Sequence, residues 1–245
     1  EIFYGGYSQY AKVDSNFLVK KPKEITSRQA MMLGTAGLTA IQCAFTTKQT
    51  REVLLLGEKV NDVIVTGASG GVGLAAVELG KHMGARVIAC ASTDEKVDFC
   101  KSHGADEGIN YTKEDLKIRI KELTDGKGAD VIYDPIGDRF SEPALRSIAW
   151  EGRFLVVGFA AGEIPKIPLN LALLKGCQIV GVFWGSWAME FPNDNMQNTM
   201  ELINMHAEGK LKPHIHAKYE LKQAHKAMEE MMNRKVRGKI VIECS

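Results

Sequence analysis

From about residue 60 onward the chain repeats one pattern, in which a short apolar run rich in β-branched residues precedes a segment of helical length. Several of the apolar runs are continuous in Val, Ile and Leu, which is typical of strands covered on both faces. The alternation predicts an α/β fold with a doubly wound, six-stranded parallel sheet. The six runs are residues 60–67, 85–91, 107–111, 129–134, 152–158 and 177–183, and the expected helices between them include LAAVELGKHMG, EKVDFCKSHG, KEDLKIRIKELTDG and SEPALRSIAWEG.

Both ends of the chain depart from this pattern. Residues 1–20 predict two edge strands of a different sheet, ended by Pro22 and followed by a helix over residues 27–45. The C-terminal elements could not all join the six-stranded sheet without lengthening it, so we expect them to belong to a second, incomplete domain. They are a helix over 195–208, a short segment around Ile215, a helix over 221–234 and a last strand, KIVIE.

The composition is that of an ordinary globular protein, since the 245 residues are 45% hydrophobic and 25% charged with a net charge of +1. A charge near zero argues against nucleic acid or an anionic membrane as partner, and it favours a small molecule. No apolar run approaches the roughly 20 residues that span a bilayer, and we expect a cytoplasmic location. The cysteines are odd in number and widely spaced, so we expect reduced thiols. They are Cys43, Cys90, Cys100, Cys177 and Cys244.

A glycine-rich turn follows the first run and opens the next helix, with Gly70, Gly71 and Gly73 in its sequence. Glycine lets the backbone turn sharply and approach a pyrophosphate, while the helix N-terminus offers N–H groups and a positive dipole. Ala68 replaces the first glycine of the G-x-G-x-x-G pattern. The strands that follow in register still favour a dinucleotide-binding Rossmann domain over a purely structural turn.

The same residues also fit the G-x-S-x-G nucleophile elbow of α/β-hydrolases, with Ser69 as nucleophile. Asp134 and either His206 or His214 follow in the required chain order. A hydrolase also needs oxyanion donors from an earlier loop, and no glycine-rich loop of that kind precedes residue 60. The sequence therefore disfavours this interpretation.

A third pattern, T-G-x-x-x-G-x-G, is typical of short-chain dehydrogenases and begins here at Thr66. Those enzymes need a Y-x-x-x-K pair, in which the lysine lowers the pKa of the tyrosine for proton transfer. None of the six tyrosines has a lysine four positions later. This class is excluded.

The end of the second strand bears on the choice of cofactor. NAD-specific domains carry an acidic residue there that bonds the ribose hydroxyls, and spacing from the glycine turn places this position at Ala91. Ser92, and Lys96 one turn into the next helix, could instead bind a 2′-phosphate. This predicts NADPH. A second interpretation remains open, in which Asp94 contacts the ribose and Lys96 is a solvated lysine.

The ordered motifs GGYSQYAKV, TAGLTA, VIVTGASGGVG, ASTDEK, GADEGINY, ADVIYDPIGD, GRFLVVGFAAG and RGKIVIE resemble the zinc-independent medium-chain dehydrogenase/reductases of the quinone oxidoreductase, or zeta-crystallin-like, group. The resemblance runs over essentially the whole chain. The stretch AMMLGTAGLTA is also similar to the acrylyl-CoA reductase branch of that superfamily.

The resemblance implies a role in cofactor binding for several residues. Backbone groups of the turn would hold the pyrophosphate, three side chains would surround the 2′-phosphate, and others would line the nicotinamide. Alternatively, Thr39 bonds within its helix, the two aromatic residues after the sixth strand are core, and Arg237 replaces Arg234. The implied residues are Ser69, Gly70, Gly71 and Val72 for the pyrophosphate, Lys96, Tyr111 and Arg234 for the phosphate, and Thr39, Gly158, Phe159, Ala160, Phe183 and Trp184 for the nicotinamide. The glycine turn itself adds Gly73 to the pyrophosphate site, and the spacing after the second strand adds Ser92 to the phosphate site.

Members of the group carry a GroES-like catalytic domain, and the resemblance implies that only its end, residues 1–24, is present here. Residues 25–210 would then be the NADP-binding domain with its linker helix, and 211–245 the return to the catalytic domain. A mitochondrial location stays open for the same reason. No zinc-ligand spacing occurs, since His214-x-His216 is only a pair, and we expect no metal.

The function that the resemblance implies is zinc-independent reduction of a quinone or conjugated enone by hydride from NADPH. No proton donor is assigned, and we expect this chain alone to bind NADPH weakly and to turn over poorly. The alternatives are an enoyl- or acrylyl-CoA reductase and a non-catalytic NADPH-binding protein of the crystallin or sensor type. The apolar last strand, CQIVGVFWG, also predicts a homodimer paired across a two-fold axis.

Overall fold

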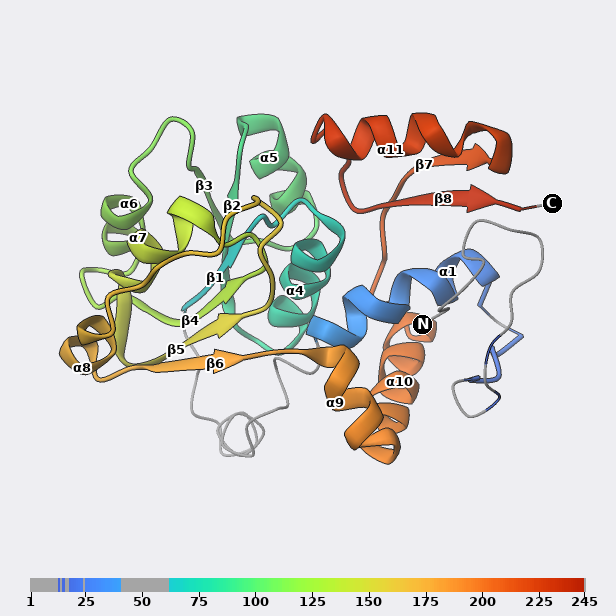
Figure 1. Ribbon diagram of the computed structural model, residues 1–245, viewed down its shortest axis with the longest axis horizontal. Helices are drawn as coiled ribbons and strands as arrows, with labels where there is room; N and C mark the ends of the chain where they lie inside the picture. The colour runs from blue at the N-terminus through green and yellow to red at the C-terminus, as the bar shows by residue number, and fades with distance from the viewer. Residues whose placement is uncertain (1–12, 14, 16–17, 24, 41–61, 245) are drawn as a thin grey trace.

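The structure, a computed structural model, describes residues 13, 15, 18–23, 25–40 and 62–244 (Figure 1). Most of the two edge strands predicted within residues 1–20 falls outside this part, and the described residues 18–23 contain no strand. The helix predicted over 27–45 is described only as far as residue 40. No helix among the described residues is both long and apolar enough to span a membrane.

Six strands form one parallel sheet in the order β3-β2-β1-β4-β5-β6 (Figure 1). The chain starts in the middle, moves outward through β2 and β3, then crosses to β4 and continues to the other edge. This order is the doubly wound Rossmann arrangement, so the predicted fold class is confirmed, and it brings the carboxyl ends of all strands to one edge. The strands are β1 (Asp62–Thr66), β2 (Arg86–Ala91), β3 (Glu107–Asn110), β4 (Ala129–Asp134), β5 (Ile148–Val156) and β6 (Gln178–Gly181).

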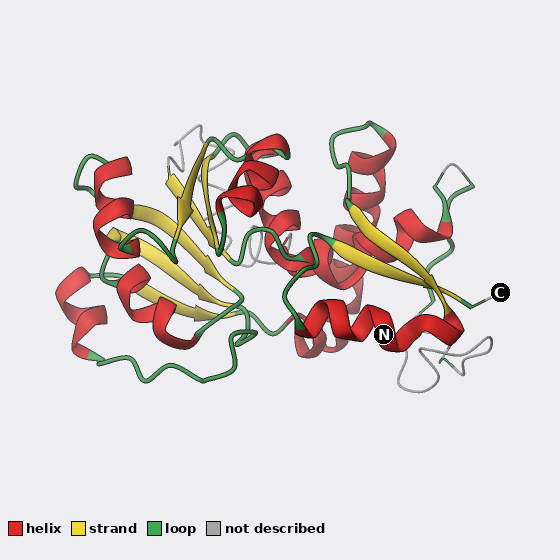
Figure 2. Ribbon diagram, turned by 90° about the horizontal axis from the view of Figure 1, so that it is seen from above, coloured by secondary structure: helices red, strands yellow, loops and turns green. Residues whose placement is uncertain are grey.

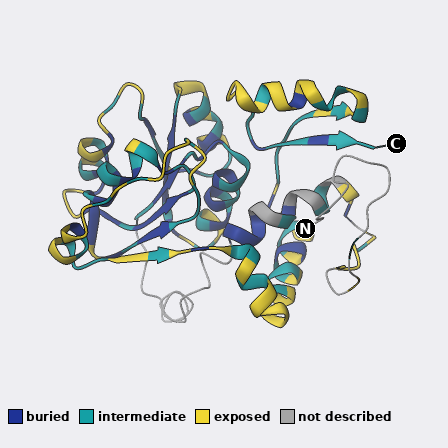
Figure 3. Cartoon of the chain, viewed as in Figure 1, coloured by how far each residue is buried: buried dark blue, intermediate teal, exposed yellow. Residues whose placement is uncertain are grey.

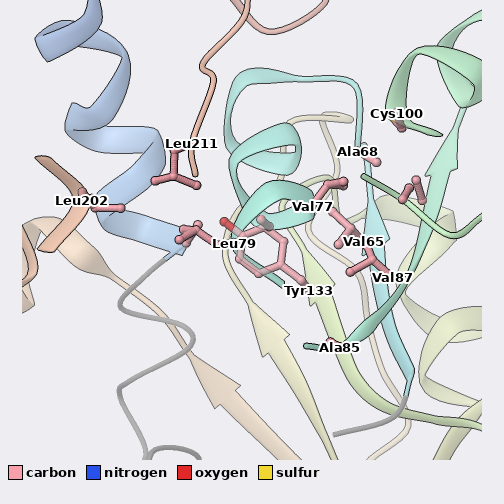
Figure 4. Packing of buried hydrophobic residues seen from close by; sticks show 14 of the residues in the cluster. Val65, Ala68, Val77, Leu79, Ala85, Val87, Cys100, Tyr133, Leu202 and Leu211 are labelled. Carbon is pink, nitrogen blue, oxygen red and sulfur yellow. The ribbon is translucent and has the colours of Figure 1, made fainter. Parts of the chain in front are cut away.

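Helices cover both faces of this sheet (Figures 1 and 2). Successive strand residues point to opposite faces, so the neighbours Ile64 and Val65 are both fully buried but belong to two separate apolar clusters. Val65 packs in the cluster that contains Val77 of the first helix after the glycine turn (Figure 4), and Ile64 in the cluster that contains Ile120. Burial is concentrated along the strands (Figure 3). The helices are α4 (Gly71–His82), α5 (Asp94–Ser102), α6 (Leu116–Leu123), η3 (Asp138–Phe140), α7 (Ser141–Leu145) and α8 (Asn170–Lys175).

One predicted helix is partly wrong. The segment SEPALRSIAWEG was expected to be helical throughout, but α7 ends at Leu145 and β5 begins at Ile148. Ile148 pairs with Ala129 at the start of β4, and both residues are buried. Pairing with a neighbouring strand therefore outweighs the helical pattern of these residues.

The remaining elements lie beside the six-stranded sheet (Figure 1). Strands β7 and β8 pair in parallel as a separate two-stranded sheet, so the C-terminal segments do not lengthen the main sheet. An isolated bridge between Gly70 and Gly238 joins the glycine turn to the start of β8. The boundaries expected after residues 24 and 210 stay predictions. The elements are α1 (Ser27–Met32), η2 (Leu33–Gly37), α9 (Trp184–Glu190), α10 (Pro192–Ala207), β7 (Ile215–Glu220), η4 (Leu221–Gln223), α11 (Ala224–Met232) and β8 (Lys239–Glu243).

Candidate functional site

The glycine turn joins β1 to α4 at the carboxyl edge of the sheet. Gly67 has a positive φ of 57°, and its carbonyl accepts the N–H of Gly70 at 3.1 Å. A Cβ atom on Gly73 would lie 2.4 Å from the carbonyl oxygen of Gly67 and 2.8 Å from the Cα of Ala68. Only glycine therefore allows α4 to pack this close to β1, and no side chain caps the N-terminus of α4. A close strand–turn–helix junction of this kind is the backbone feature that dinucleotide-binding domains share.

Cationic groups gather at the carboxyl end of β2. The Lys96 ammonium donates to the carbonyl oxygen of Arg234 at 2.7 Å and to the hydroxyl of Ser92 at 3.3 Å. Burial, with the positive charges of Arg234 and Arg237 nearby, lowers the pKa of Lys96. The structure therefore brings together Ser92, Lys96 and Arg234. The repulsion between Lys96 and the nearby arginines suits the site to an anion.

Arg234 and Arg237, the two candidates for the third phosphate-binding residue, have different surroundings in the structure. The guanidinium of Arg237 pairs with Glu95 at 2.8 Å and lies 5.4 Å from the ring centre of Phe99. Arg234 has a positive φ of 55°, which presents its carbonyl to Lys96. Both guanidinium groups lie near enough to Lys96 to affect its pKa, so both belong to the cationic cluster.

Tyr111 lies beside Ser92 in the same region. Burial raises the pKa of its hydroxyl, which shares a hydrogen bond with Ser92. Its ring centre lies 4.5 Å from that of Phe140, and the guanidinium of Arg139 lies 5.1 Å from the same Phe140 ring. Arg139 and Phe140 belong to η3, where no local motif marks them, so the sequence analysis missed them.

The carboxylate of Asp94 is occupied by partners at and after the end of β3. One carboxylate oxygen accepts the side-chain amide of Asn110 at 2.6 Å, and the other accepts the ammonium of Lys113. These contacts hold Asp94 against the end of β3 and lower the pKa of its carboxyl. The structure therefore disfavours the interpretation that Asp94 selects NAD.

Five of the six proposed nicotinamide residues, all except Thr39, occupy the carboxyl ends of β5 and β6. The loop after β5 is fixed by hydrogen bonds from the N–H groups of Gly158 and Ala160 to the carbonyls of Asp134 and Pro135, at 3.3 and 3.2 Å. Phe159 in this loop is 39% exposed.

The two aromatic residues after β6, Phe183 and Trp184, lie in different environments. Phe183 is 75% exposed and so is not a core residue. The indole N–H of Trp184 donates to Asn195 at 3.0 Å, which fixes Trp184 against α10. Thr39 is buried in the segment that follows η2, and no described contact joins it to Phe183 or Trp184. These three residues therefore differ in environment, with Phe183 exposed, Trp184 fixed to α10 and Thr39 buried.

The groups required by the hydrolase interpretation have other partners. The carboxylate of Asp134 accepts the hydroxyls of Thr66 and Ser141. His206 bonds to the Leu211 carbonyl through Nδ1, and the ring of His214 packs against those of Phe99 and His103. None of these contacts includes Ser69. Among the described residues, no three His, Cys, Asp or Glu side chains are grouped to hold a metal ion, and zinc independence stays a prediction.

Comparisons with known proteins agree on one family. The family model described as zinc-binding dehydrogenase matches residues 71–204. The quinone oxidoreductase-like protein 2 homolog of Nematostella vectensis is 36% identical over 240 residues, which are 97% of this chain and 64% of that protein. The quinone oxidoreductase of Pseudomonas syringae pv. Tomato DC3000 superposes with a TM-score of 0.82 and 32% identity, covering 93% of this chain and 68% of that chain. The chain belongs to the quinone oxidoreductase family of medium-chain dehydrogenase/reductases.

A third comparison concerns the cofactor site of this member of the quinone oxidoreductase family. The Escherichia coli quinone oxidoreductase, whose structure is complexed with NADPH, superposes with a TM-score of 0.80 and 28% identity, covering 91% of this chain and 67% of that chain. The family model begins at Gly71, so it starts where α4 opens under the glycine turn. The chain spans 64% of the length of the Nematostella relative.

Proposed function

We propose that the chain binds NADPH and that the protein uses it to reduce a small quinone or conjugated enone without zinc. The observation that carries the proposal is the cluster of Lys96, Arg234 and Arg237 beside Ser92 and Tyr111. Two arginines whose charges act on Lys96 at the end of β2 suit a 2′-phosphate, and Ala91 stands where a ribose-binding carboxylate would be. A solved relative complexed with NADPH supports the same choice of cofactor.

The glycine turn would hold the pyrophosphate of this cofactor. The turn leads into α4 at Gly71, whose first backbone N–H groups would meet the phosphates, and Gly73 permits the close approach of helix and strand. The bound cofactor would supply hydride. The chain's own groups, Gly158, Phe159, Ala160, Phe183 and Thr39, would orient the nicotinamide and keep water from it. We assign no proton donor among the described residues.

A titration tests the cofactor assignment. Lys96→Ala should weaken NADPH binding by about 10- to 100-fold, because a hydrogen bond between charged groups contributes about 1.5–3 kcal/mol. Binding of NADH should hardly change, since NADH lacks the 2′-phosphate. Lys101→Ala is the matched control, because Lys101 lies on the same helix and pairs with Glu107 at 3.8 Å. Equal losses for the two variants would overturn the assignment.

A reduction assay tests the substrate class. We expect NADPH to be oxidised by quinones and by simple conjugated enones, since the aromatic Phe159 and the highly exposed Phe183 offer flat apolar surfaces to such rings. A strong preference for an acryloyl thioester would indicate the acyl-CoA reductase branch. Binding of NADPH by the full-length protein without turnover of any enone would indicate a non-catalytic role.

We also propose that the protein forms a homodimer through β6. This strand is an edge of the main sheet, and its Ile179 is 42% exposed, with Leu174 of α8 close in sequence and 66% exposed. An exposed apolar edge strand readily pairs with another chain, and two copies of one edge pair naturally about a two-fold axis. Sedimentation of the purified protein tests this proposal.

A further inference from the structure

Asp134 is a buried carboxylate at the end of β4. It is 2% exposed, and four neutral groups donate hydrogen bonds to it. The hydroxyls of Thr66 and Ser141 donate at 2.5 and 2.6 Å, and the backbone N–H groups of Ile136 and Gly137 each donate at 3.2 Å. Burying a carboxylate is costly unless its lone pairs are filled in this way.

These donors come from separate elements at the carboxyl edge of the sheet. Thr66 ends β1 and immediately precedes the glycine turn, whereas Ile136 and Gly137 lie in the loop that follows β4. The backbone carbonyl of Asp134 accepts the N–H groups of Val157 and Gly158, at 3.0 and 3.3 Å, where the chain leaves β5. Asp134 therefore bonds to the end of β1 just before the glycine turn, to the loop after β4 and to the loop after β5.

Close packing makes the loops depend on one another. A Cβ atom on Gly67 would lie 2.5 Å from the Ile136 side chain, and one on Gly137 would lie 2.7 Å from the ring of Phe159. The N–H of Ala161 also donates to the Ile136 carbonyl at 2.8 Å. The loop after β4 is thus held between the glycine turn on one side and the loop after β5 on the other.

We propose that Asp134 is the positioning residue that fixes the glycine turn relative to the loop after β5. The functional part of this inference rests on the proposed function, because those two loops are the proposed supports of the pyrophosphate and the nicotinamide. Asp134 touches neither end of the cofactor in this scheme. It acts through Thr66, which orients the turn, and through its own carbonyl, which orients Gly158.

The chain offers a matched pair of substitutions for the test. Thr66→Val removes one donor to Asp134 at nearly constant shape. Thr124 is an equally buried threonine whose hydroxyl donates to the Ile120 carbonyl at 2.8 Å and accepts the N–H of Gly128 at 3.0 Å. It lies just before β4, at the opposite edge of the sheet, so Thr124→Val controls for the loss of a buried hydroxyl.

Hydrogen–deuterium exchange reports on the loops without any cofactor. We expect Thr66→Val to speed exchange by about tenfold in residues 67–73, 135–137 and 158–161, the effect of losing one buried hydrogen bond. Thr124→Val should leave those segments unchanged. Identical exchange maps for the two variants would overturn the inference.

Binding and rescue provide the second readout. Asp134→Ala should raise the Kd for NADPH by at least tenfold, and Asp134→Asn should restore most of the affinity and the slow exchange. An asparagine oxygen can still accept from Thr66 and the two N–H groups, while its amide donates to Ser141. Failure of Asp134→Asn to rescue either readout counts against positioning by hydrogen bonds. If wild type binds no NADPH but Thr66→Val still loosens all three loops, the positioning role stands and the proposed function fails.

Discussion

Replacing Glu78 by glutamine should stabilise the protein at pH 8 and change its stability much less at pH 5. Glu78 lies on α4 beside a cavity of about 30 Å³ that is also lined by Leu74, His214 and Gly238. Burial raises the pKa of its carboxyl from 4.5 to about 7, although the N–H and the charge of Lys212 oppose the rise. The folded protein therefore favours the protonated carboxyl near neutral pH.

The magnitude follows from this difference in pKa. A rise from 4.5 to about 7 corresponds to about 3 kcal/mol, at about 1.4 kcal/mol for each pKa unit. Because the folded-state pKa is the higher one, this stability is present below pH 4.5 and is lost as pH rises through about 7. Glutamine stays neutral and can still accept the N–H of Lys212. The free energy of unfolding of the variant should thus exceed that of wild type by about 2–3 kcal/mol at pH 8.

Urea denaturation followed by circular dichroism between pH 5 and pH 8.5 measures this difference. Burial and nearby positive charge lower the pKa of His214, but both proteins keep that histidine, so its titration cancels when the two curves are subtracted. Glu229→Gln, at an exposed position of α11, controls for the change in net charge. A difference between Glu78→Gln and wild type that does not grow with pH would refute the reasoning.

Three further outcomes are expected. Gly73→Ala should lose about 1–3 kcal/mol of stability together with NADPH binding, because the new Cβ would lie 2.4 Å from the Gly67 oxygen. Gly185→Ala on α9 would meet only the Phe183 ring, at 3.6 Å, and should not lower the melting temperature. Comparable melting temperatures for the two variants would argue against the close packing. Thr93→Ala should cost about 1 kcal/mol in thermal unfolding, because the Thr93 hydroxyl caps α5, and an unchanged melting temperature would show that the cap contributes nothing. Ile179→Lys should convert the dimer to a monomer in sedimentation velocity. A monomeric wild type would contradict the proposed β6 interface.

The main sheet could be predicted because its signal is local. Each strand falls largely within a run of β-branched and aliphatic residues, and burial on both faces demands such runs. The start of β5 could not be predicted, because Ile148 joins the sheet through pairing with Ala129 of β4, a contact that its neighbours in sequence do not reveal. Tertiary pairing decided the structure there.

The site divides in the same way. Ser92, Lys96 and Arg234 could be placed by spacing and resemblance, and the structure brings them together. Arg139 had no local signal, because its position near Tyr111 depends on the approach of η3 to that residue across the sheet edge. Glu78 was missed for the same reason, since the residue that bonds to it, Lys212, lies far along the chain.

The ratio of the dissociation constants for NADPH and NADH, measured by isothermal titration of the wild-type chain at fixed ionic strength, tests the cofactor assignment most directly. We expect NADPH to bind at least about tenfold more tightly, because the extra phosphate would meet charged donors of the Lys96 cluster. Equal dissociation constants, or tighter binding of NADH, would contradict it.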